Sequence, residues 1–414
     1  HEHPALEPVL GETLGTIIFQ DQVMQVAEAF AGFTPGEADG LRRAMSRKRS
    51  QELLARHRER FVSGAISHSG ADADVAERVW TMVEGFAGFG FPKAHSAAFG
   101  LLAYQSTWLR VHYAPEFLCA LLNEQPMGFY APDSLVHEAE RRGARVLPLD
   151  VNRSQSACVV SEGAVRLGLG YVKGISEVET VAIVAERERG GPFRSIGDLA
   201  RRVPLRSGTL EQLAWSGACD ELTGVTSRRT ALWQAGVATG AEGAPDGEAQ
   251  LALPLELPAA PGLRALGGWE RLIADYTTIG ITIGQHAIAI LRPRLTVPLL
   301  ATSAQLNRLP SGGEVAVAGL VIARQRPGTA NGTMFLLFED EFGTINLIVP
   351  QAVYEAHRHL ARAEPLLLAR GRLERHREGP ASVRWRADGE SGRARATADE
   401  EIQPVVNVLV RDLA

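Results

Sequence analysis

The sequence predicts a multidomain α+β protein in which helical modules precede a small β-barrel. Three observations support this fold class. A helical period runs through residues 13–125, glycine-centred helix pairs follow between residues 165 and 222, and strand-like alternation begins at Glu314. The chain has 414 residues, 45% of them hydrophobic, which is enough for two or three domains with cores of their own.

The first predicted block, residues 13–125, is all-helical. Its apolar residues recur close to every 3.6 positions, the spacing of a packed helix face. They are Ile17, Phe19, Val23, Val26, Ala27 and Phe30 in one helix, and Leu101, Tyr104, Trp108 and Tyr113 in a later one that Pro115 interrupts. Beyond this block, Asp133 or Ser134 is expected to cap a short helix that Gly143 ends ahead of a strand.

Two glycine-centred turns predict a tandem helix-hairpin-helix unit. Gly174 lies in "GYVKGIS" and Gly217 in "AWSGACD", with a connecting helix capped by Ser195 between them. A glycine lets the turn backbone approach a DNA phosphate, and the helix that follows directs its amide groups at the charge. The candidate DNA contacts are Lys173, Gly174, Ser176, Ser216 and Gly217. The alternative for each turn alone is an ordinary connection between two helices.

Residues 236–268 are rich in Gly, Ala and Pro, a composition typical of a linker. Within them "QLALPL" is an apolar peptide, and exposed leucines are unfavourable unless they dock on a partner. Gln250, Leu253 and Leu255 therefore predict a peptide that inserts into a sliding-clamp pocket. The alternative is that this composition is incidental to the linker.

From Glu314 onward the sequence alternates as strands do, which predicts a small closed β-barrel of the OB type. The five expected strands are "EVAVAGLVIARQR", "TMFLLFEDEFG", "TINLIVP", "PLLLARGRLERH" and "ASVRWRA". A helical insert, "QAVYEAHRHLA", follows the third strand, where this fold carries a helix. Phe335, Phe338 and Trp385 are expected in the core, with base stacking as the alternative.

The net charge of −5 and the pI near 6.2 conceal a basic segment between Leu41 and Arg60. This segment holds eight basic and two acidic residues, a local net charge of +6. Its basic residues are Arg42, Arg43, Arg47, Lys48, Arg49, Arg56, Arg58 and Arg60. Because arginine donates paired hydrogen bonds to phosphate oxygens, the segment is a candidate contact for a nucleotide or a DNA backbone. A solvated helix face is the alternative.

A glycine turn, "GFGFPKAHS", presents Lys93, His95 and Ser96. The turn lacks the spacing of a Walker phosphate loop, which makes that fold improbable. A lysine and a hydroxyl beside flexible glycines can nevertheless bind an anion. The alternative is a loop that only breaks a helix.

The sequence also excludes several classes of protein. Cys119, Cys158 and Cys219 lie far apart without a Cys-x-x-Cys pair, so neither a disulfide framework nor a structural zinc site is predicted. A reducing, cytosolic setting fits this cysteine usage, and no signal peptide or membrane span is expected. Asp72 and Asp74 are expected at the start of a helix, so the sequence predicts no catalytic residue and no metal ligand in this chain.

Two long segments carry a family resemblance. "TLGTIIFQDQVMQVAEAFAGFTPGEADGLRRAMSRKR" and "FAGFGFPKAHSAAFGLLAYQSTWLRVHYAPEFLCALLNEQPMGFY" resemble the fingers domain of bacterial C-family DNA polymerases, the alpha subunits of DNA polymerase III. The segment "NEQPMGFYAPDSLVHEAERRGARVLPLDVNRS" is similar to the corresponding segment of the error-prone, ImuC-type branch. The resemblance implies fingers at 1–148, tandem helix-hairpin-helix at 149–235, a linker at 236–268, and an OB domain with its preceding helix at 269–414.

By this resemblance the basic run would face the incoming triphosphate, and the glycine turn would line the nucleotide or template path. The residues concerned are Arg42, Arg43, Arg47 and Lys48 in the run, and Lys93, His95 and Ser96 in the turn. The expected partners are primer-template DNA, deoxynucleoside triphosphates, the β sliding clamp and accessory translesion proteins.

The resemblance also implies what this chain would not do alone. Family members bind Mg²⁺ through palm aspartates expected ahead of His1, so this cytoplasmic chain is expected to be the C-terminal part of an error-prone polymerase that binds DNA without catalysing synthesis. Two alternatives stay open. One is a fragment of a replicative alpha subunit, and the other is a non-catalytic DNA-binding clamp adaptor.

Overall fold

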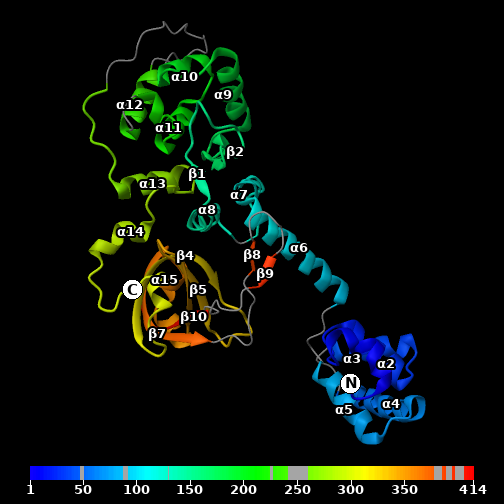
Figure 1. The fold of residues 1–414 in the computed structure, drawn as a ribbon. Helices are drawn as coiled ribbons and strands as arrows, with labels where there is room; N and C mark the ends of the chain where they lie inside the picture. Colours follow the sequence, from blue (N-terminus) through cyan, green and yellow to red (C-terminus); the bar gives the residue numbers. More distant parts are fainter. Residues whose placement is uncertain are drawn as a thin grey trace. The chain divides into compact units, whose positions relative to one another are not determined.

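The computed structural model describes residues 1–46, 51–86, 92–128, 130–223, 227–240, 260–376, 385–387, 394–396 and 405–414. The chain divides into two compact units, His1–His112 and Tyr113–Ala414 (Figure 1). Helices make up the first unit, and the second combines helices with a closed β-barrel, which confirms the predicted α+β class. Among the described residues, none of the helices is both long enough and apolar enough to cross a lipid bilayer.

The first unit packs its helices around an aromatic core. Its elements are η1 (Pro4–Leu6), α1 (Glu7–Leu10), η2 (Gly11–Thr13), α2 (Gln20–Ala31), α3 (Pro35–Ser46), α4 (Gln51–Ser69), α5 (Ala73–Gly85) and α6 (Lys93–His112). Phe61 of α4 lies between Phe30 of α2 and Trp80 of α5, with ring centroids 5.9 Å and 5.4 Å away. Gly64 lets α4 approach α2, because a Cβ there would lie 2.2 Å from the Ala31 carbonyl oxygen.

Helix α6 is apolar but not buried. The sequence places apolar residues along it at helical spacing, yet none of its side chains is buried in the structure. Tyr104 is 69% exposed, Leu101 57% and Trp108 44%. The spacing therefore predicted the helix correctly, while the packed face expected from the same residues is not formed within this unit.

The second unit begins with helices and a small three-stranded sheet. The elements are α7 (Ala114–Asn123), α8 (Pro132–Arg141), β1 (Arg145–Leu147), β2 (Val159–Ser161), β3 (Ala164–Arg166), η3 (Leu169–Tyr171), α9 (Glu177–Gly190), α10 (Ile196–Arg202), α11 (Ser207–Ser216), η4 (Asp220–Thr223) and α12 (Arg228–Gly240). Strand β3 is central, parallel to β1 and antiparallel to β2. Ser195 accepts a hydrogen bond from the Asp198 amide and caps α10, as the sequence predicts.

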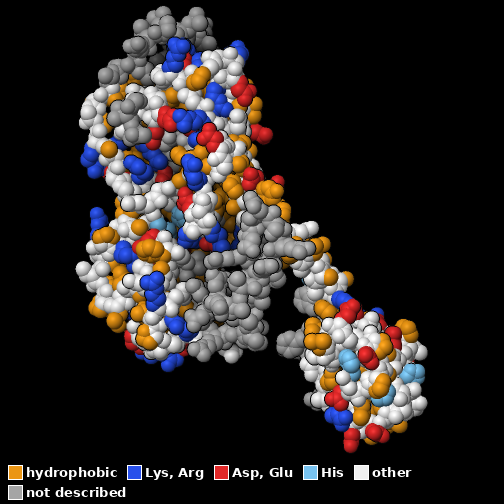
Figure 2. Space-filling view, viewed as in Figure 1, with side chains coloured by type: hydrophobic (Ala, Val, Ile, Leu, Met, Phe, Trp, Pro, Cys, Tyr) orange, Lys and Arg blue, Asp and Glu red, His pale blue; other side chains and the backbone are white. Residues whose placement is uncertain are grey.

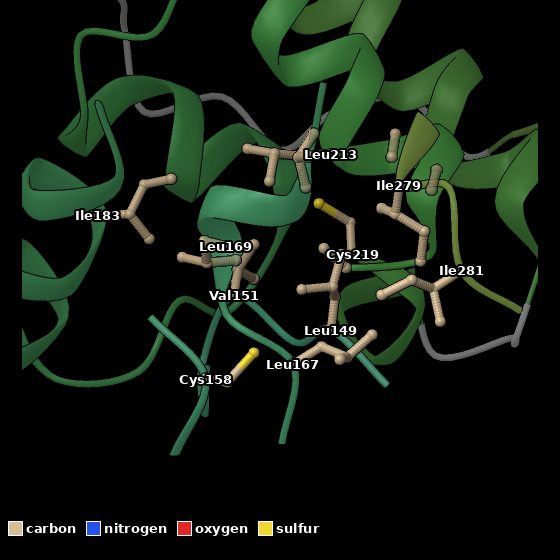
Figure 3. Close-up of a cluster of buried hydrophobic side chains, with 14 of the residues drawn as sticks. Leu149, Val151, Cys158, Leu167, Leu169, Ile183, Leu213, Cys219, Ile279 and Ile281 are labelled. Carbon is tan, nitrogen blue, oxygen red and sulfur yellow. The ribbon is translucent and has the colours of Figure 1, made fainter. Parts of the chain in front are cut away.

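One hydrophobic core joins these elements. Leu149, Leu167 and Leu169 lie between the sheet and the helices, and Ile279 and Ile281 reach the same core from beyond the linker (Figure 3). All three cysteines are buried free thiols within this core, and the Cys119 thiol donates to the Cys158 carbonyl at 3.2 Å. The core shows why Gly168 must lack a side chain, since a Cβ there would lie 2.3 Å from the Ala157 carbonyl carbon.

The start of α8 differs from the expected cap. Ala131 is the N-cap, with Pro132 in the first turn, so neither Asp133 nor Ser134 caps this helix. Asp133 is instead buried, where its carboxylate accepts hydrogen bonds from the Tyr276 hydroxyl at 2.7 Å and the Thr282 amide at 2.9 Å. The sequence pattern of a capping acid cannot reveal partners that lie more than a hundred residues away.

The rest of the second unit leads into a closed five-stranded barrel. The elements before it are α13 (Gly268–Thr278), α14 (Ala287–Leu291), η5 (Arg292–Arg294) and α15 (Ser303–Leu306). The barrel strands are β4 (Glu314–Gln325), β5 (Met334–Glu339), β6 (Thr344–Val349), β7 (Leu366–His376) and β10 (Val405–Leu413), in the order β10-β6-β5-β4-β7. Helices α16 (Gln351–Ala356) and α17 (Arg358–Ala363) follow the third strand, as predicted. This arrangement is consistent with an OB fold.

The predicted fifth strand is wrong. Within 381–387, the strand β8 (Trp385–Ala387) pairs only with β9 (Ala394–Ala396), in a separate two-stranded sheet. The barrel is closed by β10, which pairs with β6 on one side and with β7 on the other. Phe338 is fully buried in the barrel core, as expected, whereas Phe335 is 37% exposed. The side chain of Trp385 lies outside what the structure describes.

Candidate nucleic-acid interface

The turn at Gly174 is open to solvent. Its backbone has φ +85°, a left-handed conformation that favours glycine, and the Ile175 amide donates to the Val172 carbonyl at 3.2 Å. A Cβ at Gly174 would meet no atom within 4 Å. The turn therefore needs glycine for its backbone angle and leaves room for a ligand to approach.

Ser176 begins the helix that follows this turn. Its hydroxyl accepts a hydrogen bond from the Glu179 amide, and the Glu179 carboxylate accepts one in return from the Ser176 amide at 2.9 Å. This capping box fixes the first turn of α9 directly after the Gly174 turn. The local sequence "GISEVE" is enough to specify this arrangement.

Arg206 joins the turn from the N-terminus of α11. Its guanidinium donates to the Gly174 carbonyl at 2.9 Å and to the Glu179 carboxylate at 2.6 Å and 3.1 Å. The side chain is 65% exposed, so part of its charge faces solvent beside the turn. Sequence reasoning missed this residue, because nothing in the local pattern links Arg206 to a turn 32 residues earlier.

Glu179 is the acceptor that holds this turn together. Besides Arg206 and Ser176, it accepts a hydrogen bond from the Thr209 hydroxyl at 2.8 Å. The bonds from Arg206, with those from Ser176 and Thr209, hold the pKa of the Glu179 carboxyl well below its usual range, although burial opposes this shift. An ionised Glu179 therefore ties together the turn, α9 and α11.

Lys173 connects the turn to α13. Its amide donates to the Thr278 carbonyl at 2.8 Å, and its ammonium donates to the Tyr276 carbonyl at 2.6 Å. An ammonium has three donors, so this bond leaves capacity for a phosphate oxygen. Lys173 thus has a structural contact in addition to the DNA contact that the sequence predicts.

The second glycine turn has different surroundings. Gly217, with φ +88°, ends α11, and a Cβ there would lie 2.9 Å from the guanidinium of Arg228. Ser216 is buried, and its hydroxyl donates to the Leu213 carbonyl at 2.9 Å. The Arg228 side chain therefore covers this turn, whereas the Gly174 turn is open.

The basic segment of the first unit is partly neutralised by acids from outside it. Asp39 pairs with Arg42 and with Arg43, at 2.7 Å in each case. Arg58 forms hydrogen bonds to both carboxylate oxygens of Glu77. Arg60 pairs with Glu37 at 3.2 Å. Arg47 and Lys48 lie outside the described residues.

The residues of the glycine turn occupy the start of α6. The Lys93 ammonium pairs with Glu12, and its amide donates to Asp21 at 3.0 Å. The ring of His95 lies 4.4 Å from that of Phe99, one helical turn further along. Lys93 and His95 are exposed and Ser96 is half-buried. Lys93 is thus held by acidic residues of η2 and α2, and Arg42 and Arg43 are held by Asp39 on their own helix, α3.

The surface charges, the clamp peptide and the possible metal ligands complete the set of candidates. On the face shown in Figure 2, Lys and Arg side chains lie among Asp and Glu side chains over both units. The clamp-peptide residues Gln250, Leu253 and Leu255 lie outside the described residues. Within the described part of the chain, one group of side chains has ligand atoms close enough together for a metal ion, namely His137, His286 and Glu339.

Comparisons with known proteins identify two regions of the chain. Residues 1–69 match the bacterial DNA polymerase III alpha subunit finger domain, and residues 143–231 match a helix-hairpin-helix motif. Among solved structures, the asparaginyl-tRNA synthetase from Pyrococcus horikoshii covers 25% of this chain and is itself covered to 20%, at 19% identity and a TM-score of 0.16. That likeness is too slight to bear on fold or function.

Curated relatives match almost the whole chain. The error-prone DNA polymerase of Alkalilimnicola ehrlichii is 46% identical over 377 residues, which are 90% of this chain and 36% of the relative. The error-prone polymerase of Anaeromyxobacter dehalogenans is 43% identical over 91% of this chain and 33% of its own length. That of Corynebacterium glutamicum is 42% identical over 92% and 35%.

The chain therefore spans about a third of the length of the curated relatives it matches. The match and the structure agree where both exist, since the described residues within 1–69 are mainly helical and the motif at 143–231 contains the Gly174 turn. The chain combines a helical region that matches the finger domain of bacterial DNA polymerase III alpha subunits, a region that matches a helix-hairpin-helix motif, and a closed five-stranded barrel.

Proposed function

We propose that this chain acts as part of an error-prone DNA polymerase of the DNA polymerase III alpha type, in template-directed DNA synthesis past damaged bases. The observation that carries the proposal is the 46% identity to an error-prone DNA polymerase across 90% of the chain. The proposal places the fingers at 1–148, the helix-hairpin-helix domain at 149–235, the linker at 236–268 and the barrel with its preceding helix at 269–414. It assigns the chain to the ImuC-type branch and to the cytoplasm.

The proposal assigns DNA binding to the Gly174 turn. The open backbone at Gly174, the N-terminal end of α9 and the partly exposed charges of Lys173 and Arg206 converge there. Backbone amides and basic side chains of this kind contact DNA phosphates without reading sequence. The turn at Gly217 is a weaker candidate, since Arg228 covers it.

Further contacts belong to the same proposal. The exposed or half-buried Arg42, Arg43 and Lys93 are proposed to contact an incoming nucleotide, and Leu253 with Leu255 a β sliding clamp. To do so, these basic side chains would exchange their present partners, Asp39 and Glu12, for phosphate oxygens of the nucleotide.

Accessory translesion proteins are proposed partners of the whole polymerase. Two Mg²⁺ ions would supply the phosphoryl-transfer chemistry of that polymerase, and we assign none of their ligands to this chain.

A matched pair of glycine variants tests the DNA-binding proposal. Gly174 and Gly163 are both exposed, both have positive φ (+85° and +70°), and a Cβ at either would meet no atom within 4 Å. Gly174→Asp places a negative charge at the proposed phosphate site, whereas Gly163→Asp places the same charge in the β2–β3 turn. Binding of the full chain to fluorescent primer-template DNA would be measured by anisotropy across a salt series.

We expect Gly174→Asp to weaken DNA binding about tenfold and to reduce the salt slope by about one, the contribution of one phosphate contact. Gly163→Asp is expected to bind like the parent chain. Equal affinities and slopes for the two variants would show that the Gly174 turn does not contact DNA.

A further inference from the structure

Three buried side chains meet where α8 and α14 contact the barrel. His137 lies on α8, His286 is the N-cap of α14, and Glu339 ends β5. They are 7%, 8% and 0% exposed, and one ligand atom of each lies within 4.8 Å of the other two. Nothing in the sequence groups these residues, because His137 and Glu339 are 202 positions apart.

Two ring nitrogens in this cluster have no hydrogen-bond partner. Among the described residues, the Nε2 atoms of His137 and His286 are both buried and unpaired. The two rings pack edge to face with centroids 5.3 Å apart. A buried polar atom without a partner is unfavourable, and native proteins seldom keep one without a bound ion, a water molecule or a function that explains it. The unpaired Nε2 of His286 therefore indicates a missing ligand, whereas that of His137 faces the Asp133 carboxylate.

The surroundings of the cluster resemble the outer shell of a metal site. Glu339 accepts a hydrogen bond from Arg141 through Oε1 at 2.8 Å, which leaves Oε2 facing His137 Nδ1 at 3.4 Å. On the other side of that ring, the Asp133 carboxylate lies 3.7 Å from His137 Nε2. A carboxylate behind a histidine orients the ring and makes its other nitrogen a better ligand.

Metal binding would change a hydrogen bond that the cluster now makes. A neutral imidazole has one nitrogen that can either accept a hydrogen bond or bind a metal ion. His286 Nδ1 accepts the Ile288 amide at 3.1 Å, and ligation through Nε2 would give up that cap.

We propose that His137, His286 and Glu339 bind a divalent transition-metal ion of the Zn²⁺ type, which fastens α8 and α14 to the barrel. Two imidazoles and one carboxylate suit Zn²⁺ or Co²⁺, whereas Mg²⁺ and Ca²⁺ take oxygen ligands. Ligand atoms around tetrahedral Zn²⁺ are about 3.4 Å apart. The His137 to Glu339 separation already has this value, and the ion would draw His286 inward.

Spectroscopy with Co²⁺ tests the site in the full chain. The metal-stripped protein is titrated with Co²⁺, whose visible absorption is strong at four-coordinate sites, and Zn²⁺ is then added as competitor. We expect one equivalent of Co²⁺ to bind with four-coordinate bands that Zn²⁺ removes. His286→Gln and Glu339→Gln should each weaken Co²⁺ binding by more than the roughly 10–100-fold loss typical of outer-shell changes.

Control variants separate this site from the other histidines. His359→Gln removes an exposed histidine of α17, and His3→Gln removes one near the N-terminus; both should bind Co²⁺ like the parent. If a ligand variant fails to fold, zinc X-ray absorption on the parent chain still reports whether two imidazoles and an oxygen surround the ion. Absence of four-coordinate bands in the parent, or unchanged binding by His286→Gln, would overturn the proposal and assign the unpaired nitrogens to buried water.

Discussion

The Glu179 carboxylate holds the Gly174 turn in place through several hydrogen bonds. One carboxylate accepts hydrogen bonds from the Ser176 amide, the Arg206 guanidinium and the Thr209 hydroxyl. Arg206 in turn donates to the Gly174 carbonyl, so the shape of the turn depends on a charge that lies outside it. This dependence gives a prediction at the residue scale.

Glu179→Gln keeps the shape of the side chain and removes its charge. We expect the free energy of unfolding to fall by roughly 1–3 kcal/mol, because the Arg206 guanidinium loses its ionic partner. Glu177→Gln is the matched control, since Glu177 lies in the same first turn of α9 and is exposed. Denaturant unfolding of both variants measures the difference, and equal losses would contradict the role given to Glu179.

The same carboxyl predicts a pH dependence. Because Arg206, Ser176 and Thr209 depress the pKa of Glu179 in the folded state below its ordinary value of 4.5, its stabilising effect is present above that pH and is lost as the pH falls below it. Between about pH 6 and pH 3, the difference in unfolding free energy between the parent chain and Glu179→Gln should therefore stay constant at first and shrink below about pH 4.5. Unfolding curves across this range measure it, and a constant difference would show that Glu179 is not ionised through these contacts.

At the scale of elements, glycines mark where two backbones touch. In α4 a Cβ at Gly64 would lie 2.2 Å from the Ala31 carbonyl oxygen of α2. We expect Gly64→Ala to destabilise the first unit by roughly 1–3 kcal/mol, since the two helices must separate. Gly100→Ala in α6, where a Cβ meets nothing within 4 Å, should instead stabilise by up to about 1 kcal/mol. Thermal unfolding distinguishes the two signs, and a stabilising Gly64→Ala would refute this packing.

The barrel depends on a similar contact. A Cβ at Gly371 in β7 would lie 2.2 Å from the Leu409 carbonyl oxygen of β10. Gly371→Ala should cost roughly 1–3 kcal/mol and raise hydrogen exchange along β10. Gly328→Ala, in the exposed loop after β4, should change stability by less than about 0.5 kcal/mol. Unchanged exchange in β10 would mean that this strand does not close the barrel.

At the scale of the whole molecule, the chain consists of two separately packed units. Their cores share no residue, since one cluster lies within 6–83 and the others within 118–413. Destabilisation of one unit should therefore leave the other intact. In hydrogen exchange of the full chain, Gly64→Ala should raise exchange only within residues 1–112, and Gly371→Ala only within 113–414. Increased exchange in both units from either variant would show that they unfold together.

The sequence by itself determined the order and type of the modules. Helical spacing, the glycine of the Gly174 turn and the alternation after Glu314 are local patterns, and local backbone preferences act over a few residues. The capping box at Ser176 was likewise specified by residues close together in the sequence. These features could be predicted because the residues that cause them are neighbours in the chain.

Tertiary structure decided which side chains meet. Arg206 reaches Gly174 across 32 positions, His137 reaches Glu339 across 202, and β10 rather than residues 381–387 closes the barrel. Part of the positive charge of the basic segment is also neutralised by Asp39, Glu37 and Glu77, which lie outside the segment in the sequence. Charge pairing, metal ligation and strand closure depend on distance in space, and only the folded chain fixes those distances.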